Sequence, residues 1–165
     1  MKTYLWYLPR PESSYQGSYP LFFIKRFKRL VGRDDFVHLF AGASKFGFRI
    51  DMKRDNKPHI VADVHHLPFR DEVFNNSLAD PPYSNEFAKE LYNTPPLKST
   101  QWIKEMVRVT KAGGLVCIMH NYPMGKPRQC KYEFLIVIVQ RIKQYCKVVT
   151  GFRKQGTLTP FFQPL

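Results

Sequence analysis

Residues 77–83 read Ser77-Leu78-Ala79-Asp80-Pro81-Pro82-Tyr83. The first three residues suit a short buried strand, and Asp80 closes it. Two prolines follow, and because proline has no amide donor, the chain must leave the sheet as a stiff, extended loop. This loop fixes the Asp80 carboxylate and the Pro81 carbonyl as acceptors beside the Tyr83 ring. Two acceptors and a ring suit an amine on a flat base, because the acceptors take its hydrogens while the ring stacks on the base. An ordinary turn is the alternative for the tetrapeptide taken alone.

Strands closed by polar residues recur upstream. We predict strands over residues 36–40, 48–51 and 59–62, each a short β-branched or aromatic run. A glycine turn follows the first strand, Asp51 ends the second, and Asp63 follows the third. Open parallel α/β sheets bind ligands at the carboxyl ends of their strands. The pattern therefore predicts one ligand site along that edge of the sheet.

The remaining chain alternates helices and strands. Helices are predicted over residues 21–30 and 99–110, the second capped by Ser99 or Thr100, and a fifth strand over 115–119. Residues 134–139 suit a strand, paired antiparallel with 147–152 at the sheet edge, although a helix over 132–145 fits their periodicity as well. The expected fold is an α/β Rossmann-like sandwich around a mostly parallel sheet. Residues 1–20 are expected to form an extended arm without regular structure, and residues 21–165 a single domain.

Charge points to a polyanionic partner. The chain has 26 Lys and Arg against 13 Asp and Glu, a formal net charge of +13. This balance favours nucleic acid over a role in solubility alone, and Lys126, Arg128 and Lys131 are candidate phosphate contacts on the same sheet edge as Asp80. No apolar run suits a membrane span or a signal peptide, so we expect a soluble cytoplasmic or nucleoid-associated protein. The pair His65-His66 has no third ligand at metal-binding spacing, so no metal is expected.

These motifs resemble a known family. Over roughly residues 17–122 the sequence is similar to the amino-methyltransferases that act on adenine N6 in DNA, whose catalytic motif is Asp-Pro-Pro-Tyr. The run Phe40-Ala41-Gly42-Ala43-Ser44-Lys45-Phe46-Gly47 resembles their loop for S-adenosylmethionine (SAM), Phe-x-Gly-x-Gly. The run Ala62-Asp63-Val64-His65-His66-Leu67-Pro68-Phe69 resembles a signature common in SAM-dependent methyltransferases generally.

The resemblance implies SAM as cofactor and a methyl transfer to an exocyclic amine of a base, adenine N6 in DNA. The implied catalytic residues are Asp80, Pro81, Pro82 and Tyr83, and Tyr83 would also stack on the base. The implied cofactor contacts are Phe40, Ala41, Gly42, Asp51, Asp63, Val64 and Asp80.

Three departures from the family pattern matter. Gly42 and the second strand are too close in sequence for the usual crossover helix, so that helix is expected to be absent or a single turn. Ser44 stands where a second glycine is common. The chain also has no room for a target-recognition domain, so a homodimer or an accessory specificity subunit is a candidate partner.

Two alternatives remain open at this point. One is a methyltransferase for a guanine or adenine amino group in RNA, because similar Asp-Pro-Pro-aromatic motifs occur there. The other is a catalytically inactive, methyltransferase-like subunit that binds nucleic acid. The shortened glycine region favours the inactive subunit, and the intact tetrapeptide opposes it.

Overall fold

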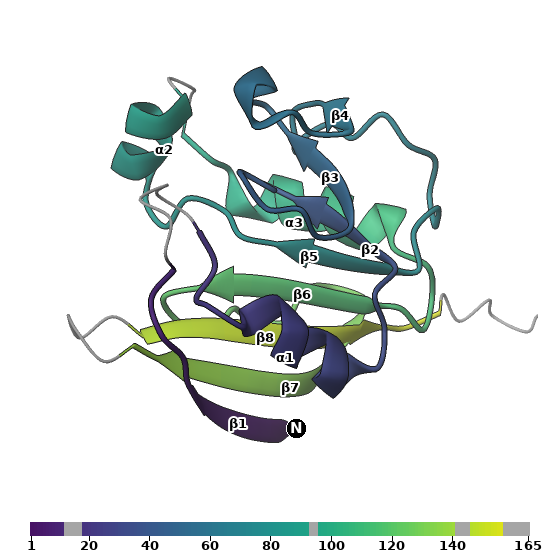
Figure 1. Ribbon diagram of the computed structural model, residues 1–165. Helices are drawn as coiled ribbons and strands as arrows, with labels where there is room; N and C mark the ends of the chain where they lie inside the picture. Colours follow the sequence, from purple (N-terminus) through teal and green to yellow (C-terminus); the bar gives the residue numbers. More distant parts are fainter. Residues whose placement is uncertain (12–17, 93–95, 141–145, 157–165) are drawn as a thin grey trace, which may run out of the picture.

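The computed structural model describes residues 1–11, 18–92, 96–140 and 146–156 (Figure 1). Within them an eight-stranded sheet has the order β1-β7-β8-β6-β5-β2-β3-β4. Strand pairs are parallel except for β8, which runs antiparallel to both β6 and β7. The strands are β1 Lys2–Tyr7, β2 Phe36–Leu39, β3 Phe48–Asp51, β4 Ile60–Val61, β5 Asn76–Ala79, β6 Leu115–His120, β7 Cys130–Val139 and β8 Cys146–Lys154. The helices are α1 Phe23–Val31, the 3-10 turn η1 Arg54–Asn56, α2 Asn85–Tyr92 and α3 Ser99–Val109.

Helices cover both faces of the central strands. In Figure 1, α1 lies in front of the sheet and α3 behind it. Phe23 and Phe27 of α1 belong to one core cluster, and Trp102 and Met106 of α3 belong to the other. Because both faces are covered, every residue of β2, β5 and β6 is buried, as expected for interior parallel strands.

The order of the strands reverses beside β2. The chain goes from β2 outward to β3 and β4, then returns to place β5 on the other side of β2. The last residues of β2 and β5 are in register, Leu39 opposite Ala79. A reversal of this kind leaves a crevice at the carboxyl ends of the two strands, where open α/β sheets bind ligands.

The structure corrects the expectation for the N-terminal arm. Residues Lys2–Tyr7 form β1, which pairs in parallel with β7 at the edge of the sheet. Trp6 of β1 is buried and packs in the same cluster as Phe23 and Phe27. Residues 12–17 of the predicted arm lie outside the described residues.

Three further differences concern the second half of the chain. The helix considered over residues 132–145 is wrong for its first part, because Cys130–Val139 form β7 and alternate between buried and half-buried along most of their length; residues 141–145 lie outside the described residues. The predicted antiparallel hairpin is confirmed, but β8 lies between β6 and β7 and the edge position belongs to β1. The N-cap of α3 is Lys98, without a side-chain cap bond, so Ser99 and Thr100 do not cap the helix.

The predicted loss of the first crossover helix is confirmed, since no helix lies between β2 and β3. Among the described residues, every helix is too short or too polar to span a bilayer.

Candidate active site

The tetrapeptide begins at the reversal of strand order. The Asp80 amide donates to the Leu39 carbonyl of the neighbouring strand at 3.4 Å, so the proline loop starts directly beside the glycine turn. Pro81 is buried, and Pro82 and Tyr83 are half-buried. The two motifs that are far apart in sequence therefore meet at one point of the sheet edge.

Asp80 and Tyr83 form a hydrogen-bonded corner, which we call the Asp80 corner. The Tyr83 hydroxyl donates to Oδ1 of Asp80 at 3.0 Å. The Lys147 ammonium, from β8, lies 5.5 Å from the centre of the Tyr83 ring. Burial raises the pKa of Asp80, and Lys147 and the bond from Tyr83 oppose that rise. Burial and the nearby Asp80 raise the pKa of Tyr83, so its hydroxyl stays a neutral donor.

The glycine turn is held by Asp51. Phe40 and Gly42 both have positive φ angles, 54° and 50°, which make the tight turn. The Asp51 carboxylate, 1% exposed, accepts the Gly42 amide on Oδ2 and the Lys53 amide on Oδ1, each at 2.7 Å. Phe40 packs edge-on against Trp102, and Ala41 is buried beside it. Asp51 therefore joins the end of β3 to the turn after β2.

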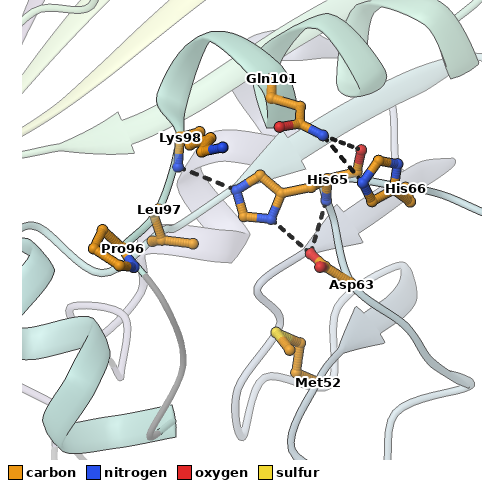
Figure 2. A pocket seen from close by; sticks show the side chains of 8 residues that line it. All are labelled: Met52, Asp63, His65, His66, Pro96, Leu97, Lys98 and Gln101. Carbon is orange, nitrogen blue, oxygen red and sulfur yellow. Dashed lines mark hydrogen bonds and ion pairs between the residues drawn. The ribbon is translucent and has the colours of Figure 1, made fainter.

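Asp63 lies on a cavity of about 190 Å³ (Figure 2). Its Oδ1 accepts both the His65 amide at 2.9 Å and Nδ1–H of the His65 ring at 2.7 Å. The other ring nitrogen of His65 accepts the amide of Lys98 at 3.2 Å, which fixes the tautomer. Burial raises the pKa of Asp63, but the hydrogen bonds from the His65 amide and ring outweigh it and the net pKa is lowered. The lining residues are Met52, Asp63, His65, His66, Pro96, Leu97, Lys98 and Gln101.

A salt bridge holds the loop after Asp63 against α3. Arg108 donates two bonds to Glu105, both at 2.7 Å, and further bonds to the carbonyls of Phe69 and Leu67. Glu105 in turn accepts the amide of Leu67 at 2.9 Å. Val64, in the same loop, is 1% exposed and belongs to the core cluster beneath α3. The Arg108 cluster therefore positions the wall that carries Asp63.

A second cavity of about 200 Å³ lies against the Asp80 corner. It shares Leu97 with the first cavity, so the two are neighbours. Its walls combine aromatic and proline rings with polar side chains. They comprise Pro81, Pro82, Tyr83, Ser84, Asn85, Leu97, Ser99, Trp102, His120, Tyr122 and Met124.

The three basic residues proposed to contact phosphates are exposed. Lys131 pairs with Arg153, and Arg153 pairs with Leu115 at the start of β6, whereas the Asp80 corner adjoins the other end of the sheet. The expected location on the active-site edge is therefore wrong for Lys131. The cause is that β6 and β7 run in the same direction, so the connection between them returns the chain to the opposite end of the strands before β7 begins. Lys126 and Arg128 lie within that connection.

Sequence reasoning missed two groups that the structure brings to the site. Lys147 reaches the Asp80 corner because β8 is inserted beside β6, a pairing that no local pattern indicates. His65 was considered only as a metal ligand, but it holds Asp63. The spacing of Glu105 and Arg108, one helical turn apart, was a visible signal for the cluster that positions the Asp63 loop. No group of three metal-ligating side chains occurs within the described parts of the chain.

Comparison with known proteins gives matches in structure only. The sequence matches no protein-family model and no curated protein. The structure is similar to TrmN from Thermus thermophilus, with 17% identity, a TM-score of 0.65, and 86% of this chain and 51% of that chain covered. The chain thus spans about half the length of TrmN. It is also similar to the N-methyltransferase NodS from Bradyrhizobium japonicum, with 10% identity, a TM-score of 0.57, and coverage of 82% and 97%.

A third similar structure is 1,6-didemethyltoxoflavin-N1-methyltransferase from Burkholderia thailandensis, solved with 1,6-didemethyltoxoflavin and S-adenosylhomocysteine. Its identity is 9% and its TM-score 0.57, with 80% of this chain and 76% of that chain covered. This chain therefore has the Rossmann-like fold of SAM-dependent methyltransferases.

Proposed function

We propose that this chain is a SAM-dependent N-methyltransferase that methylates an exocyclic amine of a nucleic-acid base, adenine N6 in DNA. The observation that carries the proposal is the Asp80 corner: a half-buried carboxylate and an aromatic ring, joined by a 3.0 Å hydrogen bond, beside a cavity at the reversal of strand order.

The residues present fit SAM. The positive φ angles of Phe40 and Gly42 turn the backbone so that a ligand can approach the glycine closely. Asp51 and Asp63 end adjacent strands, and the amide of Ala62 bonds to the Asp51 carbonyl, so both acids lie along one edge. Asp51, the acid expected to meet the ribose hydroxyls, is 1% exposed and would support the ribose site by holding the Gly42 and Lys53 amides. Asp63, Met52 and Leu97 line the first cavity and would face the adenine, while Val64 lies in the core cluster against which Leu97 packs.

SAM would supply an electrophilic methyl group. The chain would supply position: the Asp80 carboxylate and the Pro81 carbonyl accept the two hydrogens of the target amine, which leaves the nitrogen lone pair free to attack. Orientation of this kind accounts for much of the acceleration in such reactions. As the new N–C bond forms and the methyl–sulfur bond breaks, the nitrogen would become positive and release a proton. Asp80, whose pKa burial raises, is the nearest acceptor for it.

The aromatic walls of the second cavity favour a flat substrate. Tyr83 is positioned to stack on a base that has left its helix, as in other enzymes that act on extruded bases. The small volume of the second cavity suits one ring system, since pockets for drug-sized ligands have volumes of roughly 300 Å³ or more. The chain's +13 charge favours a polynucleotide over a free nucleoside, with Lys126, Arg128 and Lys131 as proposed phosphate contacts away from the reacting centre.

The test is methyl transfer from isotope-labelled SAM to DNA and to RNA, followed by mass spectrometry of the nucleosides. We expect labelled N6-methyladenine from DNA, absent with Asp80→Asn and retained with Asp34→Asn, an exposed surface control. A methylated amine from RNA alone would transfer the proposal to the RNA alternative. SAM binding without transfer to either would favour the inactive nucleic-acid-binding subunit, and a chain that binds no SAM would refute the proposal.

A further inference from the structure

His120 is a buried polar side chain with an unpaired nitrogen. It ends β6, is 5% exposed, and lines the second cavity. Its Nδ1 is buried and has no hydrogen-bond partner within the described residues. Buried polar groups in folded proteins are nearly always paired, so an unpaired nitrogen in a residue that lines a cavity needs an explanation.

The ring of His120 is held in place by its neighbours. Its centre lies 5.1 Å from that of Tyr83 and 4.1 Å from that of Tyr122, both at tilted angles. Two aromatic contacts of this kind restrict rotation of the imidazole. His120 is thus a fixed polar group on the wall that also carries the proposed stacking ring.

The imidazole is suited to a neutral partner. Burial lowers the pKa of His120 and a side-chain hydrogen bond with Asn121 opposes that fall, so the ring is neutral near pH 7. A neutral imidazole can carry its proton on Nδ1 and donate, or leave Nδ1 as an acceptor. The atoms beside an exocyclic amine on a base are ring nitrogens, and in adenine they accept hydrogen bonds.

We propose that Nδ1 of His120 hydrogen-bonds a ring nitrogen of the target base and thereby selects which base enters the second cavity. This inference rests on the proposed function and adds a specificity residue to it. Asp80 would hold the amine and Tyr83 the face of the base. His120 would then hydrogen-bond the edge of the base beside the amine, a contact that the roles of Asp80 and Tyr83 do not supply. It is a positioning and selecting residue and takes no part in bond formation.

The experiment pairs variants with altered bases. The methylated base is replaced in the oligonucleotide by analogues in which one ring nitrogen at a time is carbon. For adenine these are 1-deaza-, 3-deaza- and 7-deazaadenine. His120→Phe keeps an aromatic ring between Tyr83 and Tyr122 but has no nitrogen, and His120→Asn places an amide near the position of Nδ1. Thermal unfolding checks that both variants fold.

With wild-type protein we expect one analogue to lower kcat/KM about tenfold, the loss that corresponds to one neutral hydrogen bond. With His120→Phe the natural base should react about tenfold more slowly. The analogue that lowers kcat/KM in the wild type should lower it no further in this variant. His120→Asn should recover part of the discrimination. If every analogue were penalised equally in wild type and His120→Phe, the inference would be overturned while the proposed function stood.

A second readout does not need methyl transfer. Protein labelled with 15N-histidine, in the presence of S-adenosylhomocysteine, is titrated with the nucleoside and with its deaza analogues, and His120→Asn assigns the resonance. We expect the Nδ1 signal to move with the nucleoside and to stay with the analogue that lacks the paired nitrogen. A signal that does not respond to the nucleoside overturns the inference, even if no substrate is ever methylated.

Discussion

Asp51→Asn tests whether the Asp51 carboxylate stabilises the connection between β2 and β3, which lacks a crossover helix. In this fold the turn after β2 is joined to β3 without a crossover helix, and the Asp51 carboxylate accepts the amides of both Gly42 and Lys53 at 2.7 Å. An asparagine has only one acceptor oxygen, so one of the two amides must lose its partner. Hydrogen bonds to charged groups contribute roughly 1.5–3 kcal/mol each, which sets the expected loss in free energy of unfolding.

The loss can be expressed as a melting temperature. With an unfolding entropy of about 2.1 cal/mol/K per residue, a chain of this length has about 350 cal/mol/K, so 1.5–3 kcal/mol lowers the melting temperature by about 4–9 °C. Thermal unfolding followed by circular dichroism measures it, and calorimetry should show weaker SAM binding as well. Asp55→Asn, at an exposed aspartate in η1, is the matched control and should change neither. Equal melting temperatures for wild type and Asp51→Asn would refute the reasoning.

Three further substitutions have defined outcomes. Asp80 has a raised pKa, so its stabilising protonated form is present at low pH and lost as pH rises through that pKa. Asp80→Asn should therefore melt at or above the wild-type temperature at pH 7 while transferring no methyl group, and a large destabilisation would contradict this. Arg108→Ala should cost roughly 1–3 kcal/mol in urea unfolding and weaken SAM binding, whereas unaltered binding would show that the loop holds without it. His38 is buried with its pKa lowered to about 4, so stability should fall by up to roughly 3 kcal/mol as pH drops from about 6.5 to 4. His38→Gln should flatten that dependence, and an equally steep curve would exclude His38 as its source.

The site was predictable where its signals are local. The end of a strand is marked in the sequence by a glycine turn, or by Asp80 and two prolines. Parallel strands place such ends along one edge of the sheet. The sequence therefore indicated that the glycine turn, Asp51, Asp63 and Asp80 would gather, and the structure places all four there. The absent crossover helix was predictable for the same reason, since Gly42 and Phe48 leave no room for one.

Non-local pairing was the part that could not be predicted. Lys2–Tyr7 is rich in strand-forming residues, but the prolines and serines that follow it favoured an irregular arm. Its partner strand, β7, lies far away in the sequence, so no local pattern indicates the pairing. The insertion of β8 between β6 and β7 likewise depends on contacts distant in sequence. This insertion brings Lys147 to Asp80, and the return of the chain to the start of β7 moves Lys131 away from the site.

The connection from β6 to β7 shows how this fold joins two strands of the same direction without a crossover helix. Residues 121–129 must cross β8, about 10 Å, and return from the level of Val148 to that of Lys154, about 20 Å along the strands. The diagonal of about 22 Å lies within the roughly 30 Å that such a segment spans when extended, so no helix is required. Met124 anchors the crossing, since its amide donates to the Thr150 hydroxyl at 3.0 Å and its side chain is buried against the α3 cluster. Here, as at Asp51, a side-chain acceptor ties down a short connection. The residues at the carboxyl ends of the strands are therefore held by their own strands and by a few side-chain hydrogen bonds, so a substitution such as Asp80→Asn can remove function without removing the fold.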